Sequence, residues 1–194
     1  MAMTDTRAPI PRMKAEDRRE QILSEAFQLI SVGGFNAVSL SDIAKACGIQ
    51  KSSVLHHFPS MNDLLFAVLQ KREEQDYEFY AAQPAQEAPT GPRAARERFT
   101  RVFQHNLERH EFVRLYSILS AEALSPDHPA HEYFAMRSRV ARGEVARFLE
   151  WKDDPALAAA EFLAFWDGLE LSWRHDPDLD PLAIWESYCD RFFV

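Results

Sequence analysis

The sequence has little of what a disulfide-stapled, secreted or membrane protein needs. Its 194 residues include two cysteines, Cys47 and Cys189, which lie far apart and argue against a disulfide framework. No apolar run approaches the ~18 residues of a membrane span. Residues 1–14 also lack the apolar core of a secretion signal. We therefore expect a protein of the reducing cytoplasm, with no membrane partner.

Motifs for enzyme chemistry are also missing. The sequence has no Gly-rich phosphate loop, no nucleophile elbow and no HExxH segment. His128 and His131 lie beside Asp127 and Glu132, but no second pair of ligands follows. Solvated or helix-capping histidines are therefore favoured over a zinc site. We expect no catalytic residues, no metal and no cofactor.

The composition favours helices. Glycine is scarce, with 6 residues, and Ala, Leu, Glu, Arg and Phe dominate a chain that is 46% hydrophobic. The net charge of −8 argues at first against a nucleic-acid partner, but it is unevenly distributed. Residues 1–72 sum to +2 and the remainder to −10. A mildly basic N-terminal part on an acidic body fits a DNA-binding head.

Hydrophobic periodicity and helix-breaking residues divide the chain into an all-α architecture. We expect a flexible basic arm over residues 1–13 and a Pro-rich linker over 83–92. Nine helical patterns remain: 14–32, 40–46, 50–57, 60–82, 93–110, 112–124, 129–150, 155–175 and 181–192. We predict a helix-turn-helix domain of three helices over 14–58. A larger helical domain for effector binding and dimerisation follows over 59–194.

The segment 39–58 has the pattern of a helix-turn-helix. Ser39 and Asp42 can cap the first short helix, and Gly48 permits the positive φ that the tight turn needs. The second short helix offers a polar surface that can enter the major groove. The predicted DNA contacts are Arg18, Ser39, Ser41, Gln50, Lys51, Ser52, Ser53, Leu55, His56 and His57. The same pattern also fits a helical hairpin buried in another all-α protein.

The residues between Arg19 and Val68 resemble the N-terminal domain of the TetR family of repressors. The resemblance rests on these groups: Gly33, Gly34 and Phe35; Asp42, Ile43 and Ala44; Cys47, Gly48 and Ile49; and Phe58, Pro59 and Ser60. It implies an all-α homodimer whose first three helices bind DNA. The remaining helices would hold an effector pocket and the dimer interface.

Two positions depart from the family. It usually has Tyr at Leu55 and Lys at Met61, and both usual residues contact DNA phosphates. We expect their loss to lower the affinity and to flatten its salt dependence by ~1 per contact. Our hypothesis is that one of four cations partly compensates: Arg12, Lys14, Arg18 or Lys51.

The stretches 115–142 and 165–180 also resemble the family, more loosely, and imply a pocket between the body helices. The body is rich in aromatic residues, which at helical spacing are more often core than ligand contacts. The residues selected for an effector pocket are Phe103, Leu107, Tyr116, Leu119, Tyr133, Phe134, Arg137 and Trp166. Arg137 in such a pocket would indicate an anionic effector, although pairing with a surface acid is the favoured interpretation.

The patterns over 155–175 and 181–192 are apolar on more than one face, which indicates contact with both a core and a partner. The predicted dimer interface comprises Leu157, Phe162, Phe165, Leu169, Trp173, Trp185 and Phe192. A thick monomeric core is the alternative interpretation of the same pattern.

Three functions fit these observations to different degrees. The leading prediction is a DNA-binding transcriptional regulator, a repressor released from a palindromic operator by a small-molecule effector. The second is a non-enzymatic helical binding or adaptor protein with weakened DNA binding, suggested by Leu55 and Met61. The third is an enzyme that uses the helical pocket, for which no sequence feature supplies catalytic groups.

Overall fold

A computed structural model describes residues 13–82 and 91–194, and every regular element in these residues is a helix. The elements are α1 (Ala15–Gly33), α2 (Leu40–Ala46), α3 (Lys51–His57), α4 (Met61–Ala82), α5 (Pro92–Glu108), α6 (His110–Glu122), α7 (His131–Arg147), α8 (Pro155–His175) and α9 (Pro181–Phe192). The all-α prediction of about nine helices is therefore confirmed for the described part. Most of the predicted arm and linker lies outside it. None of the described helices is long and apolar enough to cross a membrane.

Local sequence determines where several helices begin. The side chain of Ser39 accepts a hydrogen bond from the Asp42 amide, and the Asp42 carboxylate accepts one from the Ser39 amide, so the predicted capping box is confirmed. Asp154 caps α8 and Asp180 caps α9, and each is followed by a proline in the first turn. Proline suits that position because its missing amide hydrogen would have no partner there.

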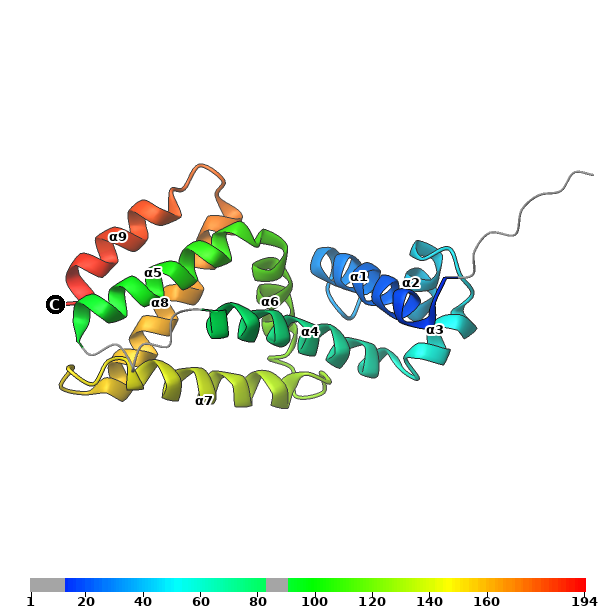
Figure 1. The fold of residues 1–194 in the computed structure, drawn as a ribbon, viewed down its shortest axis with the longest axis horizontal. Helices are drawn as coiled ribbons and strands as arrows, with labels where there is room; N and C mark the ends of the chain where they lie inside the picture. Colours follow the sequence, from blue (N-terminus) through cyan, green and yellow to red (C-terminus); the bar gives the residue numbers. More distant parts are fainter. Residues whose placement is uncertain (1–12, 83–90) are drawn as a thin grey trace, which may run out of the picture.

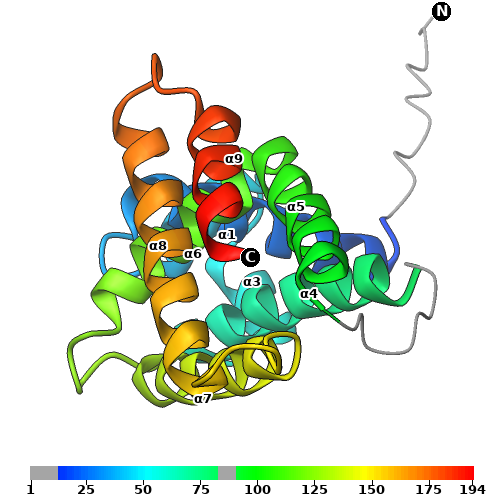
Figure 2. The same ribbon diagram turned by 90° about the vertical axis from the view of Figure 1, so that its left-hand side faces the viewer.

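The helices form an elongated molecule with a head at one end. Helices α1, α2 and α3 make this head, and α4 reaches from it along the body (Figure 1). At the far end, α5, α8 and α9 lie around the C-terminus, and α7 runs along one side (Figure 2). Helix α6 packs against α1 and so joins the body to the head.

Two hydrophobic clusters fill the molecule. The head core contains residues of α1 to α3 together with Leu64, Leu65, Val68 and Leu69 of α4 and Leu115 and Leu119 of α6. The body core lies between α5, α7, α8 and α9, around Phe103, Phe162 and Trp185. The domain boundary predicted after residue 58 stays a prediction, but the first half of α4 packs with the head.

A carboxylate at the end of α6 holds the turn after α1. Glu122 accepts hydrogen bonds from the backbone amides of Phe35 (2.8 Å) and Asn36 (3.2 Å), and from the Asn36 side chain (3.1 Å). Gly34 allows this approach, because it has φ +83° and a Cβ there would lie 2.6 Å from Glu122 Oε1. The geometry therefore requires glycine for two reasons: backbone conformation and space.

We predict that Gly34→Ala lowers the free energy of unfolding by about 2–3 kcal/mol. About 1–2 kcal/mol of this comes from the backbone of Gly34, whose φ of +83° and ψ of +166° are essentially restricted to glycine, and the rest from hydrogen bonds that Glu122 loses when it moves aside. Gly48→Ala is the matched control, since Gly48 has φ +67° but open space around its Cβ position. Urea unfolding of both variants checks this. An equal loss in the two would mean that the contact with Glu122 does not matter.

Candidate DNA-binding surface and effector site

The turn between α2 and α3 is set by close packing beneath it. Gly48 has positive φ, and the Ile49 amide then donates to the carbonyl of Ala44 at 2.9 Å. Ile43 and Val54 are fully buried between the two helices. This small core fixes the orientation of α3 relative to α1 and α2.

The outer face of α3 is polar and accessible. Lys51, Ser52, Ser53 and His56 are exposed, and Gln50 is exposed at the N-cap position without a side-chain capping bond. His57 is half-buried, and burial lowers its pKa. Exposed hydroxyl, amide and ammonium groups on a short helix are suited to contact base edges and phosphates.

The other predicted DNA contacts surround this face. Ser39 and Ser41 are exposed at the start of α2. Arg18 on α1 is half-buried, and its Nη1 donates to Gln21 Oε1 at 2.6 Å. That contact uses one of the five N–H donors of the guanidinium, so the other donors remain able to contact a phosphate.

The two departures from the family lie in different environments. Leu55 is 39% exposed on α3 and presents an apolar side chain on the predicted DNA face. Met61, at the start of α4, is half-buried and packs against the head core. A lysine at position 61 would lose that packing. The methionine therefore stabilises the head core, whereas a lysine would add a positive charge.

The predicted effector residues divide between the two cores. Tyr116, Tyr133, Phe134 and the fully buried Leu119 belong to the head core or pack against it. Phe103, Leu107 and Trp166 belong to the body core or pack against it. Arg137 lies between the sets, with its guanidinium 4.7 Å from the centre of the Tyr116 ring. The structure therefore places the eight residues in two groups, and their role in effector binding stays a prediction.

A cluster of polar residues between the two cores was missed by sequence reasoning. We call Arg72, Asp76, Asn106, Arg109 and Glu170 the central polar cluster. Asp76 Oδ1 lies 3.0 Å from Arg109 Nη1, and its Oδ2 lies 3.3 Å from Arg72 Nε. Glu170 accepts from Asn106 at 2.7 Å and from the Trp166 indole at 2.8 Å. Burial raises the pKa of Glu170.

A sequence signal for this cluster does exist in α4. Arg72 and Asp76 continue the spacing of the buried Leu65 and Leu69, so they occupy the inward face of the helix where apolar residues stop. A charged pair on an inward face is unusual, since buried charges need partners. Composition alone could not identify it, because α4 carries many charges on its outer face as well.

The predicted dimer residues need a correction. Phe162, Leu169 and Trp185 are buried inside a single chain, in the body core, so they are not available to a partner. Phe165, Trp173 and Phe192 are half-buried. Leu157 is 57% exposed. The prediction is wrong for these three because the body core of the same chain buries them, and for the other four it stays a prediction.

A different surface of α8 is left exposed. Leu157, Glu161, Ala164, Gly168 and Leu171 recur at spacings of four and three residues, and all are exposed. We call this the α8 stripe. Its small central residues permit close approach of another helix, and Leu157 and Leu171 are apolar near its ends.

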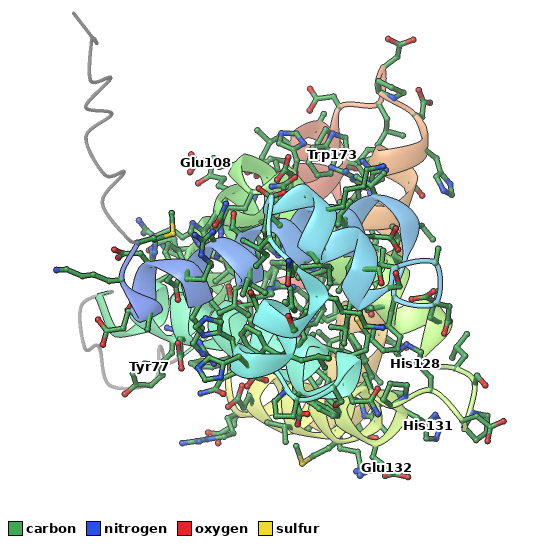
Figure 3. All side chains as sticks on the ribbon, turned by 90° about the vertical axis from the view of Figure 1, so that its right-hand side faces the viewer. Tyr77, Glu108, His128, His131, Glu132 and Trp173 are labelled. Atoms are coloured by element: carbon green, nitrogen blue, oxygen red, sulfur yellow. The ribbon has the colours of Figure 1, made fainter. Side chains whose placement is uncertain are left out.

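His128 and His131 lie beside the connection between α6 and α7, well away from Trp173 (Figure 3). His131 Nδ1 donates to the carbonyl of Ala123 at 2.8 Å. His128 Nδ1 accepts from the Ala130 amide at 3.1 Å, and its ring packs edge-on against Phe35. Within residues 13–82 and 91–194, no group of three or more His, Cys, Asp and Glu side chains is suited to hold a metal ion.

His128 links the protonation state to the contact between head and body. Its buried Nε2 lies 4.0 Å from Glu122 Oε2 and has no hydrogen-bond partner among the described residues. Burial lowers the pKa of His128 below its ordinary value of 6.5, and nearby Glu122 offsets this in part. The folded chain therefore binds fewer protons here than the unfolded chain just below pH 6.5.

We predict that His128→Asn reduces the loss of stability on acidification. For the wild type, the contribution of His128 falls as the pH drops from 6.5 to its lower folded pKa. Asn keeps an acceptor for the Ala130 amide but does not titrate. Thermal unfolding at several pH values between about 8 and 5 checks this, using the difference near pH 8 as the packing cost alone. Parallel curves for the two proteins would contradict it.

Comparison with known proteins finds similarity to bacterial regulatory proteins, most of it in the N-terminal part of the chain. Residues 22–68 match the model of the bacterial regulatory proteins of the tetR family. The HTH-type transcriptional repressor KstR2 of Mycolicibacterium smegmatis is 30% identical over 139 residues, which cover 70% of this chain and 64% of that protein. The Escherichia coli regulator UidR is 33% identical over 61 residues, 31% of each chain. The chain thus spans about a third of the length of this relative.

Solved structures share the whole fold. A TetR-family regulator from Agrobacterium tumefaciens superposes with a TM-score of 0.74 at 21% identity, covering 93% of this chain and all of that one. The fatty acid degradation regulator FadR of Bacillus halodurans gives a TM-score of 0.70 at 16% identity, covering 96% and 97%. At these identities the likeness concerns the fold.

Proposed function

The chain belongs to the TetR family of bacterial regulatory proteins, and from this premise we propose that it is a transcriptional regulator that binds a palindromic DNA operator through α3. Regulators of this family bind DNA operators and usually act as dimers with small-molecule effectors. The observation that carries the proposal is the exposed polar face of α3, held by the small core under the turn. We propose repression as the mode, as the name of the relative KstR2 suggests.

The proposed mechanism depends on the distance between two copies of α3. In a symmetric dimer, both helices reach successive major grooves only when they lie about one DNA turn apart, ~34 Å. An effector that binds more tightly to a dimer with a different spacing of the two helices shifts the protein to that conformation, and the operator is released. The proposed effector site lies between α4, α5, α6, α7 and α8, where the two cores meet, and the proposal includes no catalytic step.

The adaptor alternative rests on Leu55 and Met61. Without the usual phosphate contacts at these positions, DNA binding would depend on the remaining cations of the head. An anisotropy titration of the protein on the DNA upstream of its own gene, at two salt concentrations, separates the alternatives. Saturable, sequence-dependent binding at ~10⁻⁸ M or tighter supports the regulator. Binding that is weak, sequence-blind and lost at moderate salt supports the adaptor.

We predict that Lys51→Ala weakens operator binding several-fold and flattens the plot of log affinity against log salt by ~0.9, the loss of one phosphate contact. Lys51 is exposed in the first turn of α3. Arg101→Ala is the matched control, because Arg101 is exposed on α5, in the body. Anisotropy titrations over a salt series measure both slopes. A wild-type slope for Lys51→Ala would remove Lys51 from the interface.

We further propose that the α8 stripe forms the centre of the dimer interface. Leu171→Glu is then expected to shift the protein from dimer to monomer, because the new charge would be buried without a partner. Val140→Glu is the control: Val140 is similarly exposed, at 52% against 47% for Leu171, but lies on α7. Sedimentation at micromolar concentration gives the masses. A dimeric Leu171→Glu protein would count against this interface.

A further inference from the structure

Arg72, in the central polar cluster, has buried guanidinium donors that form no hydrogen bond with the described residues. Its side chain is only 7% exposed, yet Nη1 has no hydrogen-bond partner among the described residues. Nε faces Asp76 at 3.3 Å, in an ion pair that lacks hydrogen-bond geometry. A buried guanidinium normally has its donors satisfied, and a native exception calls for an explanation such as a missing ligand.

Arg72 shares its ion-pair partner with a second arginine. The Asp76 carboxylate is shared with Arg109, which also donates to Gln75 at 2.8 Å. A further guanidinium, that of Arg137, lies near the same Tyr116 ring on which Arg72 is stacked at 3.7 Å. The Asp76 carboxylate therefore serves two arginines, and it leaves Arg72 Nη1 without a hydrogen bond among the described residues.

The remaining acids of this region do not supply the missing partner. Glu170 uses one oxygen for both Asn106 and Trp166, and burial raises its pKa, which favours the neutral form. Asp167 faces Arg137 rather than Arg72, and its pKa is also raised. Glu73 is exposed and accepts from Tyr133. No hydrogen bond joins any of these three acids to Arg72 in the described structure.

A chain of hydroxyl groups leads from Arg72 to the surface. The Tyr116 hydroxyl, on the ring that stacks on Arg72, lies 2.7 Å from the Tyr133 hydroxyl, and Tyr133 donates to Glu73 at 2.8 Å. The guanidinium of Arg72 and the hydroxyls of Tyr116 and Tyr133 thus belong to one region, and such donors are the usual environment of a bound carboxylate or phosphate.

We propose that the effector carries an anionic oxygen group, a carboxylate or a phosphate, that binds the guanidinium of Arg72. This inference rests on the proposed function and specifies the chemical class of its effector. Arg72 also connects the ligand to DNA binding, because it follows the α4 residues that form part of the head core. A ligand held by Arg72 thus acts directly on the helix that joins body and head.

The test measures binding to the free, full-length protein by calorimetry and thermal unfolding. The probes are octanoate and octyl phosphate, with octanol and octylammonium as matched neutral and cationic compounds. We expect one or both anions to bind and to raise the unfolding temperature, with little response to the other two. The anion that binds distinguishes a carboxylate effector from a phosphate effector.

Variants identify the residue responsible. Arg72→Met, of similar length, should weaken anion binding by roughly tenfold or more, the value of a charge-assisted hydrogen bond. Without ligand it should unfold at the wild-type temperature or higher, because Asp76 keeps Arg109 as a partner. Arg72→Lys should bind anions with intermediate affinity, and the surface control Arg101→Met should match the wild type.

Three results would overturn the proposal. The first is that wild type and Arg72→Met respond equally to both anions, which includes the case in which neither protein responds. The second is that octylammonium binds more tightly than the anions. The third is that both Arg72 variants bind the anions with wild-type affinity. DNA binding is measured separately, by the operator titration without ligand. A protein that binds anions through Arg72 but no operator would contradict the proposed function alone.

Discussion

Helix α4 runs through both head and body, so its inward face must fit an apolar core at one end and a polar cluster at the other. The other helices are arranged around this constraint. The first turns of α4 bury Leu64, Leu65, Val68 and Leu69 in the head core. One turn later the same face carries Arg72 and Asp76 into the body. Apolar burial of this kind is worth about 1.5–3 kcal/mol per large side chain, so the head end of α4 is fixed. The charged part has no comparable apolar burial and depends on specific partners.

Helix α6 provides the second connection, and it does so with polar bonds as well as packing. Leu115 and Leu119 enter the head core, and Glu122 binds the turn after α1. Head and body therefore meet along two helices with different chemistry. If the body shifted, the movement would act on the packed side chains of α4 and on the hydrogen bonds that Glu122 of α6 makes with the head.

The parts of the fold that could be predicted are those set by neighbours in the sequence. Ser39 with Asp42, Asp154 with Pro155, and Asp180 with Pro181 mark helix starts because a cap and its amides lie within one turn. The predicted 155–175 and 181–192 patterns match α8 and α9 for this reason. The helix-turn-helix was equally predictable, since Gly48 and the small Ala44 reflect a local turn.

The residues of the body were harder to assign, because burial there depends on helices far apart in the sequence. Trp185 looks like an interface residue along α9, but α5 supplies Thr100 as the acceptor for its indole and Phe103 as a stacking partner. Arg72 looks like one of many surface charges until α6 brings Tyr116 over it. Periodicity identifies which face of a helix is inward, but not whether the neighbour on that face belongs to the same chain.

The bond between Glu122 and the turn after α1 bears on how such a protein can be recombined with its relatives. A chimaera that joins this head to the body of a relative keeps Gly34, but its backbone amides are held only if that body has a carboxylate where this chain has Glu122. The reverse exchange places Glu122 against a turn that need not have room for it. Compatibility of transplanted heads should therefore be judged first from this pair of positions, ahead of overall sequence identity.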